Sequence, residues 1–422
     1  MMNPGGDTEM TSAVREAIND LLVAVCEETA KSVEGHEEAS INDILDITFV
    51  ANPVMHHLLL GIDPIELGGA PFALAFDEST ALPAAEMGIQ ANRNARAYVL
   101  PCIAGHVGAD TAGVMLAEQP HQLDEISLLV DVGTNAEIVL GNRERIVACS
   151  SPTGPAFEGA QISGGQRAAP GAIERIRIDK ETLEPKFSVI GSELWSDDGD
   201  FDESIKDIGV TGICGSGIIE AIAEMFLAGI INTDGVINGE MAEKSSRVIA
   251  DGRTFSYLLH DGDVRIVITQ NDVRQIQLAK AALYAGVKLL MDRLGIDAVQ
   301  RIRLAGAFGS HIDVKYAMIL GLIPDCVLEQ VTSAGNAAGN GARIALMNAD
   351  SRFEIESMVH NVEKIETAVE PKFQEHFVEA MAFPHKSDPF TQLGSVVDLP
   401  ERTNNEDKSK ERGRKSRRRK RA

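Results

Sequence analysis

The stretch LLVDVGTNAEIVLG, residues 128–141, constrains the fold of this chain most, because it places a tight glycine turn between two apolar runs. Residues 128–132 predict a buried strand that ends around Asp131, and residues 137–140 predict the returning strand. Gly133 permits a sharp turn of the backbone between the two strands. The sequence therefore predicts a hairpin with a polar tip.

The residue types at this tip suit a phosphate group. Backbone N–H groups in a glycine-containing turn converge on an anion, and the Thr134 hydroxyl and the Asn135 amide add further donors. Asp131 at the strand end is placed to hold a hydrated Mg²⁺ ion that neutralises the phosphate. The alternative is an ordinary hairpin in which Gly133 and Asn135 serve only the turn. The hairpin alone leaves both interpretations open.

Helical and strand-like patterns alternate along the chain, which is typical of an α/β protein. Residues 160–265 are difficult to assign apart from one helix, and the acidic stretch SDDGDFDES at 196–204 is predicted to be a surface loop. The apolar spacing predicts the following elements: helices over 11–31, 53–60, from about 110, 215–229 and 271–295, and strands over 46–51, near 97–103 and over 301–310.

Two further turns rich in small residues follow predicted elements. The strand RIRLAGAFGS carries Gly306 and Gly309, which bring the backbone close to whatever lies at its carboxyl end, and SAGNAAGNGARIALMN leads from such a turn into a helix. Ligands of open α/β sheets bind at the carboxyl ends of the strands. We therefore expect the tips at 131–135, 306–310 and 335–336 to share one cleft.

Length and composition narrow the class of protein. The 422 residues suit two domains or one bilobal unit, and 44% hydrophobic with 24% charged residues is typical of a soluble globular protein. No apolar run predicts a membrane span or a secretory leader. The cysteines are isolated from one another, which favours a reducing cytoplasm and argues against an iron–sulfur or zinc site built from closely spaced ligands. They are Cys26, Cys102, Cys149, Cys214 and Cys326.

The charge is distributed unevenly. The whole chain has a formal net charge of −24, yet residues 401–422 hold eleven Lys and Arg against four Asp and Glu, so the remainder is still more acidic. This basic tail has almost no apolar residue to bury and is predicted to be disordered. It is either a solvated arm or a contact for nucleic acid or an acidic partner. The acidic body argues against nucleic-acid binding by the protein as a whole.

A series of motifs resembles one known family. In collinear order they are VMHHLLLGIDP, LPCIAGHVGADT, DVGTNAEI, GPAFEGAQI, ICGSGII, DVRQIQLAKAA, LAGAFGSHID, GLIP and GNAAGNGA. Together they resemble, over about residues 40–348, the ATP-dependent reductive activators of corrinoid proteins, which belong to the acetate/sugar kinase, heat-shock chaperone and actin superfamily. The resemblance implies an actin-like (ribonuclease H-like), two-lobed nucleotide-binding fold of the α/β class.

The same resemblance implies a function. ATP and Mg²⁺ are the implied cofactors, and the implied partner is a corrinoid protein of a methyltransferase system, which the chain would activate reductively. DVGTN is similar to the second phosphate-binding hairpin of the superfamily, and LAGAFG to the segment that binds the adenosine. The predicted nucleotide-site residues are Asp131, which also holds the metal, Gly133, Thr134, Asn135, Gly306, Ala307, Gly309, Gly335 and Asn336.

Several other residues in these motifs have both a functional and a structural interpretation. Asp110, in a motif similar to the connecting helix at the domain interface, either orients the attacking water or caps the helix. Glu158 in GPAFEGA serves either the catalytic cleft or the helix dipole. Cys214 is either a small buried residue in a tight turn or a reactive thiol at a helix start. His56 and His57 are either packing and capping residues or metal ligands.

The sequence also departs from the family pattern. Such activators usually begin with a [2Fe–2S] domain, a linking domain and a first phosphate hairpin of the Asp-x-Gly-Thr-Thr type, and no such motif precedes Thr11. We therefore expect an incomplete first lobe, no iron–sulfur cluster in this chain, weak ATP binding and negligible ATP hydrolysis by the chain alone. The open sheet edge near residues 46–51 predicts self-association or the need for a partner.

The expected organisation has four parts. Residues 1–124 form a partial first lobe, 125–350 the second lobe with the phosphate and adenosine motifs, 351–400 a C-terminal extension, and 401–422 the basic tail. Two other functions remain open at this point. One is a non-catalytic module that binds a corrinoid protein, and the other is a small-molecule kinase of the same superfamily.

Overall fold

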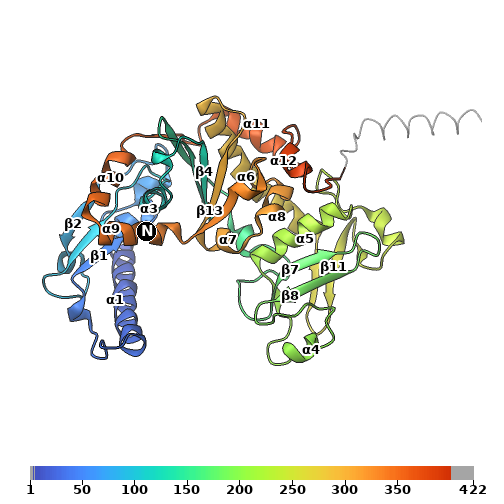
Figure 1. Cartoon of the computed structure of the whole chain (residues 1–422), viewed down its shortest axis with the longest axis horizontal. Coiled ribbons are helices and arrows are strands. Elements are labelled where there is room, and N and C mark those ends of the chain that lie inside the picture. Colours follow the sequence, from blue (N-terminus) through green and yellow to red (C-terminus); the bar gives the residue numbers. More distant parts are fainter. Residues whose placement is uncertain (1–2, 4, 401–422) are drawn as a thin grey trace, which may run out of the picture. The chain divides into compact units, whose positions relative to one another are not determined.

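The structure is a computed structural model that describes residues 3 and 5–400, with only the backbone of Ala307, Phe308 and Ser310. The chain divides into two compact units, and each of them combines strands with helices, so the α/β class is confirmed (Figure 1). Unit 1 comprises Met1–Pro152, Gly286–His311 and Glu329–Phe373, and unit 2 comprises Thr153–Ala285, Ile312–Leu328 and Gln374–Ala422.

Unit 1 begins with a small sheet supported by two helices. The sheet order is β1-β3-β2, in which β1 is an edge strand parallel to β3. Val14, Ile18 and Leu22 recur at helical spacing on α1 and pack against the apolar cluster beneath this sheet. The elements are α1 (Gly6–Ser32), β1 (Asp46–Phe49), α2 (Pro53–Leu60), β2 (Thr80–Pro83) and β3 (Arg96–Val99), with short 3₁₀ turns η1 (Ile41–Asp43), η2 (Ile65–Gly68) and η3 (Ala84–Met87).

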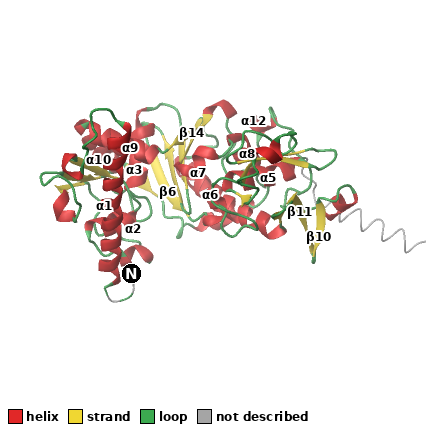
Figure 2. Cartoon of the chain, turned by 90° about the horizontal axis from the view of Figure 1, so that it is seen from below, coloured by secondary structure: helices red, strands yellow, loops and turns green. Residues whose placement is uncertain are grey.

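The main sheet of unit 1 has six strands in the order β14-β13-β4-β5-β6-β15. β4, β5 and β6 form an antiparallel meander, and β13 lies parallel to both β4 and β14. These strands appear in yellow between the helices in Figure 2. Their bounds are β4 (Ser127–Val132), β5 (Ala136–Gly141), β6 (Ile146–Ser151), β13 (Arg301–Ala305), β14 (Val331–Gly335) and β15 (Val362–Lys364).

Helices cover both faces of this sheet, as the alternation of its side chains requires. Val139 and Ala148 belong to the core cluster under α3, whereas the neighbouring Ile138 and Cys149 lie against Gly286 of α6. The other helices of this unit are α3 (Ala109–Glu118), η4 (Pro120–Gln122), the end of α6 (Gln270–Leu294), α7 (Gly306–His311), α9 (Ala337–Met347) and α10 (Ala349–Val359).

Unit 2 contains the region that the sequence left unassigned. It has two three-stranded sheets, β8-β7-β9 and β10-β11-β12, and the buried helix α5 packs on β7. Its strands are β7 (Ala172–Ile178), β8 (Pro185–Val189), β9 (Gly212–Ile213), β10 (Val248–Asp251), β11 (Thr254–Asp261) and β12 (Arg265–Ile268). Its helices include η5 (Pro155–Glu158), α4 (Phe201–Ser204), α5 (Gly215–Leu227), η6 (Gly239–Glu243), α8 (Val314–Leu320) and α12 (Thr391–Gly394), while η7 (Leu328–Gln330) and α11 (Pro371–Glu379) lie at unit boundaries.

Two predicted elements differ from the structure. The expected strand over 301–310 ends at Ala305, because Gly306 adopts a left-handed conformation with φ of 86° and opens α7. The expected surface loop at 196–204 contains α4, which anchors its otherwise exposed residues through buried Phe201. An apolar side chain inside an acidic run is the signal that the loop interpretation missed.

Three other expectations bear on the class of protein. None of the described helices is long and apolar enough to cross a membrane. All five cysteines are free and buried. The predicted basic tail, residues 401–422, lies outside the described residues, and the predicted division of the chain into four parts stays a prediction.

Candidate functional site

The three predicted tips lie side by side at one end of the six-stranded sheet. β13 is the neighbour of both β4 and β14, and Ala305 at its carboxyl end is opposite Asp131 and Gly335. The sheet register thus brings together segments that are far apart in the sequence. Their role in nucleotide binding stays a prediction.

The hairpin predicted from residues 128–141 is confirmed. Val132 pairs with Ala136, so a three-residue turn joins the strands, and the Gly133 N–H donates to the Asn135 carbonyl oxygen at 3.1 Å. The side chains of Thr134 and Asn135 are exposed at the tip. The two donors that the sequence assigned to a phosphate therefore face outward from the sheet end.

Gly306 lies directly against the Asp131 carboxylate. A Cβ atom built on Gly306 would lie 2.5 Å from Asp131 Oδ1, closer than real side chains approach. The positive φ of 86° at Gly306 disfavours any other residue for a second reason. Any larger residue at position 306 would displace the Asp131 carboxylate, so this close approach requires glycine.

Asp110 does not cap its helix. The N-cap of α3 is Gly108, and Asp110 lies in the first turn, where its carboxylate accepts a hydrogen bond from the Thr111 N–H at 2.8 Å. The capping interpretation of Asp110 is thus wrong by two positions. Burial raises the pKa of Asp110, although the hydrogen bonds from the Thr111 backbone N–H and hydroxyl partly oppose this shift.

Three partly buried carboxyl groups form a cluster at the sheet end: Asp110, Asp131 and Glu137, here called the carboxylate cluster. Asp131 and Glu137 are directly opposite each other on β4 and β5. Burial, with the charge of Asp110, raises the pKa of Asp131 to about 6. Burial, with the charges of both aspartates, raises the pKa of Glu137 to about 8, although the Ser150 hydroxyl donates to it at 3.3 Å.

Sequence reasoning missed Glu137 as a member of this cluster. The signal was available, because a three-residue turn after Val132 sets residue 137 opposite residue 131. In the described part of the chain, neither Asp131 nor Glu137 forms an ion pair with Lys or Arg. Acidic groups that repel one another in this way are stabilised by a cation.

The cluster fits Mg²⁺ held together with a phosphate-bearing ligand. Among the described residues, no group of three or more His, Cys, Asp or Glu is arranged to hold a metal ion by itself. Mg²⁺ does not require such a group, since it keeps several waters and takes one or two carboxylates plus phosphate oxygens. Asp131 belongs to the predicted phosphate tip, and Glu137 lies opposite it on β5.

The remaining predicted residues have local roles that the structure describes. Asn336 is the N-cap of α9, and its side chain accepts from the Gly339 N–H at 2.9 Å. Glu158 is exposed at the end of η5 in unit 2, and its assignment to the site stays a prediction. Cys214 is a buried N-cap of α5, which agrees with the interpretation as a small buried residue.

His56 and His57 are packing residues. Both are fully buried, and burial with the neighbouring His57 lowers the pKa of His56 to about 4. His57 contacts the Pro53 carbonyl oxygen through Nδ1 at 2.9 Å and accepts the Ala75 N–H through Nε2. The cap of their helix is Asn52 instead.

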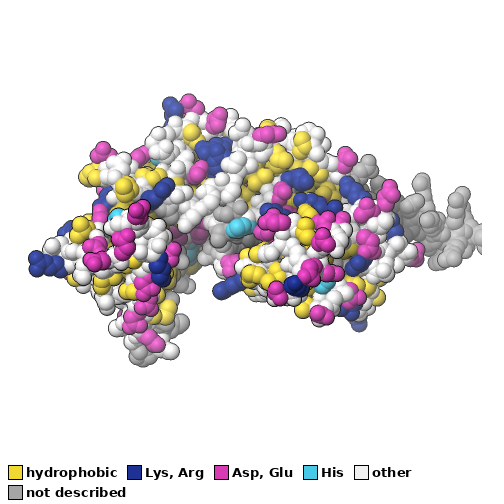
Figure 3. Space-filling model, turned by 60° about the horizontal axis from the view of Figure 1, so that its bottom comes forward, with side chains coloured by type: hydrophobic (Ala, Val, Ile, Leu, Met, Phe, Trp, Pro, Cys, Tyr) yellow, Lys and Arg dark blue, Asp and Glu magenta, His cyan; other side chains and the backbone are white. Residues whose placement is uncertain are grey.

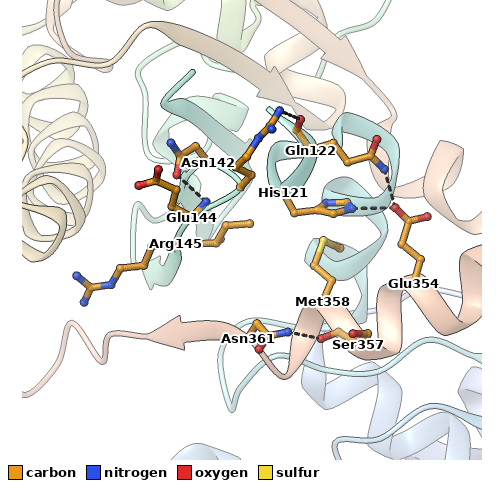
Figure 4. A pocket seen from close by; sticks show the side chains of 11 residues that line it. His121, Gln122, Asn142, Glu144, Arg145, Glu354, Ser357, Met358 and Asn361 are labelled. Atoms are coloured by element: carbon orange, nitrogen blue, oxygen red, sulfur yellow. Dashed lines mark hydrogen bonds and ion pairs between the residues drawn. The ribbon is translucent and has the colours of Figure 1, made fainter. Parts of the chain in front are cut away.

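A hollow of about 580 Å³ lies at the other end of the sheet (Figure 4). The β5–β6 turn and α10 line it, and Gly141 before that turn pairs with Ser127 at the start of β4. In Figure 4, the His121 ring and the Gln122 amide point to the same oxygen of Glu354, each at 2.8 Å. This hollow is therefore separate from the predicted nucleotide tips.

The sheet and its glycine-bearing ends define an actin-like nucleotide-binding fold. Residues 125–394 match the sequence family described as the C-terminal domain of RACo, the ASKHA domain, and residues 1–123 match the RACo middle region. The chain belongs to the RACo family.

Relatives of stated function cover most of this chain. The corrinoid activation enzyme RamQ of Eubacterium limosum is 33% identical over 380 residues, which are 87% of this chain and 59% of RamQ. The [Co(II) methylated amine-specific corrinoid protein] reductase of Methanosarcina barkeri is 29% identical over 271 residues, 62% of this chain and 46% of the reductase.

A solved structure agrees with these matches. It is titled reductive activator for corrinoid,iron-sulfur protein, and it superposes with a TM-score of 0.77 at 31% identity over 93% of this chain and 60% of that one. The chain thus spans about half to three fifths of the length of the relatives it matches.

Proposed function

We propose that this chain binds ATP at the three tips and supplies the nucleotide-binding part of a reductive activator of corrinoid proteins. The observation that carries the proposal is the carboxylate cluster, held beside Gly306 at the end of β4. The names of the related proteins support a corrinoid protein as the partner. A methyltransferase system is the class of partner that the sequence motifs imply.

The residues at the tips would divide the work as follows. The Thr134 and Asn135 side chains would donate hydrogen bonds to a phosphate group, and Asp131 would hold the Mg²⁺ ion that accompanies this phosphate. Bound Mg²⁺ would supply positive charge against the phosphate oxygens. Asp110, whose pKa is raised by burial, is the group that we propose to orient water beside them.

Activation requires that nucleotide binding change the chain's affinity for one state of the corrinoid protein. A ligand shifts an equilibrium only by its differential affinity for the two states. All five cysteines are buried, so we assign electron transfer to a group outside the described residues and place the chain in the cytoplasm. The edge strand β1 is the surface through which we expect self-association or partner binding.

Phosphate release by the purified chain, measured with and without a Co(II) corrinoid protein, tests this function. We expect negligible release by the chain alone, and nucleotide-dependent binding to the corrinoid protein that Asp131→Asn abolishes. If the affinity for the corrinoid protein is the same with and without ATP, the chain is instead a non-catalytic binding module. A phosphorylated small molecule among the products would indicate a kinase.

A further inference from the structure

A second hollow, of about 610 Å³, lies at the amino end of β13. Arg301 begins this strand opposite Ser127, whereas the predicted nucleotide tip is at its other end, beside Ala305. Four residues of strand separate the two ends by about 13 Å. The lining residues are Ala117, Glu118, Gln119, Gln122, Leu123, Arg301, Arg303, Thr332 and Ser333.

The two arginines in this hollow share one carboxylate. Arg301 Nη2 donates to Glu118 Oε2 at 3.1 Å, and Arg303 Nε lies 3.2 Å from the same oxygen. Alternate residues of a strand point to the same face, which is why both guanidinium groups meet there. Arg303 also contacts the Thr332 hydroxyl on the neighbouring strand.

These guanidinium groups are mostly withdrawn from water. The side chains of Arg301, Arg303 and Glu118 are only 16%, 22% and 17% exposed. A guanidinium group has five N–H donors, and the contacts that the structure describes use one N–H group of Arg301 and two of Arg303. Donor capacity therefore exceeds what Glu118 and Thr332 take up.

The charge in the hollow is unusual for this protein. Its lining carries two positive charges and one negative charge, although the chain as a whole is strongly acidic and acidic side chains are spread over the face drawn in Figure 3. Burial lowers the pKa of Arg301, and the nearby charge of Arg303 lowers it further, against the opposing effects of Glu118 and Glu125. The two guanidinium groups therefore repel each other, and a second anion bound between them would reduce this repulsion.

We infer that this hollow binds the oxyanion group of a small molecule, a phosphate or a carboxylate, between Arg301, Arg303 and the hydroxyl of Thr332. The rigid fork of a guanidinium group matches both kinds of oxyanion. The Thr332 hydroxyl on β14, which accepts from Arg303, adds a neutral donor on the same side. The inference does not depend on ATP binding at the tips.

Calorimetric titration of the full chain with inorganic phosphate, and separately with acetate, at constant ionic strength tests the site. We expect saturable binding of at least one anion in the millimolar range or tighter, and the better anion identifies the ligand class. Arg303→Gln should weaken it at least tenfold. Glu118→Gln should strengthen it at least threefold, because it removes the competing carboxylate while it keeps the shape of the side chain.

The matched control is Arg143→Gln in the neighbouring hollow, whose guanidinium pairs with exposed Asp124. It should leave anion affinity unchanged. Circular dichroism and the unfolding temperature verify that each variant is folded. An Arg303→Gln protein that still binds the anion as tightly as the wild type, or no saturable binding of either anion, would overturn the inference.

Discussion

Carboxyl groups that are fully or partly buried occur in both units, yet they are in opposite electrostatic situations. In unit 2, the Glu220 side chain is 1% exposed and accepts from Arg175 Nη1 at 2.8 Å, Arg177 Nη1 at 2.6 Å and the Ile176 N–H at 2.9 Å. In unit 1, burial raises the pKa values of Glu137 and Asp131, and the charges of neighbouring carboxylates raise them further.

The difference distinguishes a structural carboxylate from a functional one. A buried charge that is paired and hydrogen-bonded fixes the packing of α5 on β7 and needs no further partner. Carboxyl groups whose pKa values are raised by burial and by like charges are typical of functional sites. The carboxylate cluster has this second character, and four substitutions test the distinction.

The largest effect is expected at the paired carboxylate. Glu220→Ala leaves Arg175 and Arg177 without their shared partner, so the free energy of unfolding should fall by about 3–5 kcal/mol. Denaturant unfolding followed by circular dichroism measures this loss. The nucleotide affinity of the folded molecules should not change. A decrease in unfolding free energy of less than about 1 kcal/mol would contradict the structural role of Glu220.

A smaller effect, on binding instead of stability, is expected for Asp131→Ala. Mg²⁺–nucleotide affinity should fall about tenfold to a hundredfold, roughly 1.4–2.7 kcal/mol, because the variant lacks the carboxylate proposed to hold the hydrated ion. Nucleotide affinity in chelator should stay unchanged or rise. Calorimetry under both conditions decides, and equal losses would exclude the metal role.

Gly306→Ala tests the close approach to Asp131. The added Cβ would lie 2.5 Å from Oδ1 at a positive φ, so we expect a loss of about 1–3 kcal/mol in unfolding free energy together with weaker nucleotide binding. Gly295→Ala is the matched control, since its φ is 68° and nothing lies within 4 Å of the added atom. If the two variants lose equal stability and both bind normally, the contact with Asp131 has no role.

The smallest effect should be a stabilisation by Glu137→Gln. The folded pKa of about 8 lies above the unfolded value, so ionisation of Glu137 lowers wild-type stability as pH rises from about 4 to 8. The variant should therefore unfold about 3 °C higher than the wild type at pH 8 and at nearly the same temperature at pH 5.

The control for this pH dependence is Glu363→Gln. Hydrogen bonds from Arg145 and Arg293 lower the pKa of Glu363, so its ionised form is favoured in the folded state. This variant should lose a little stability above pH 5 and gain none at pH 8. A Glu137→Gln protein that loses stability at pH 8 would show that the ionised Glu137 is stabilising.

The sequence predicted most of the local elements around the site. The hairpin at 128–141, the helix over 53–60 and the long helix ending before Gly295 agree with β4–β5, α2 and α6, because their apolar spacing and turn residues are strong local signals. Apart from the helix over 215–229 and the loop at 196–204, residues 160–265 were not assigned. One of their strands, β9, has only two residues and pairs with β7 across a long separation, and such pairing leaves little local pattern.

The sequence by itself determined the chemistry of the tips: an acid at a strand end, glycines where the backbone turns, and Thr134 and Asn135 as exposed donors. These follow from residue type and local conformation, which depend on few neighbours. Only the tertiary structure decided which charges meet. It set Glu137 opposite Asp131, placed Asp110 near both, and brought Glu118 from α3 to the two arginines of β13. Burial and distance control a pKa or an ion pair, and both arise only when strands distant in sequence pair in one sheet.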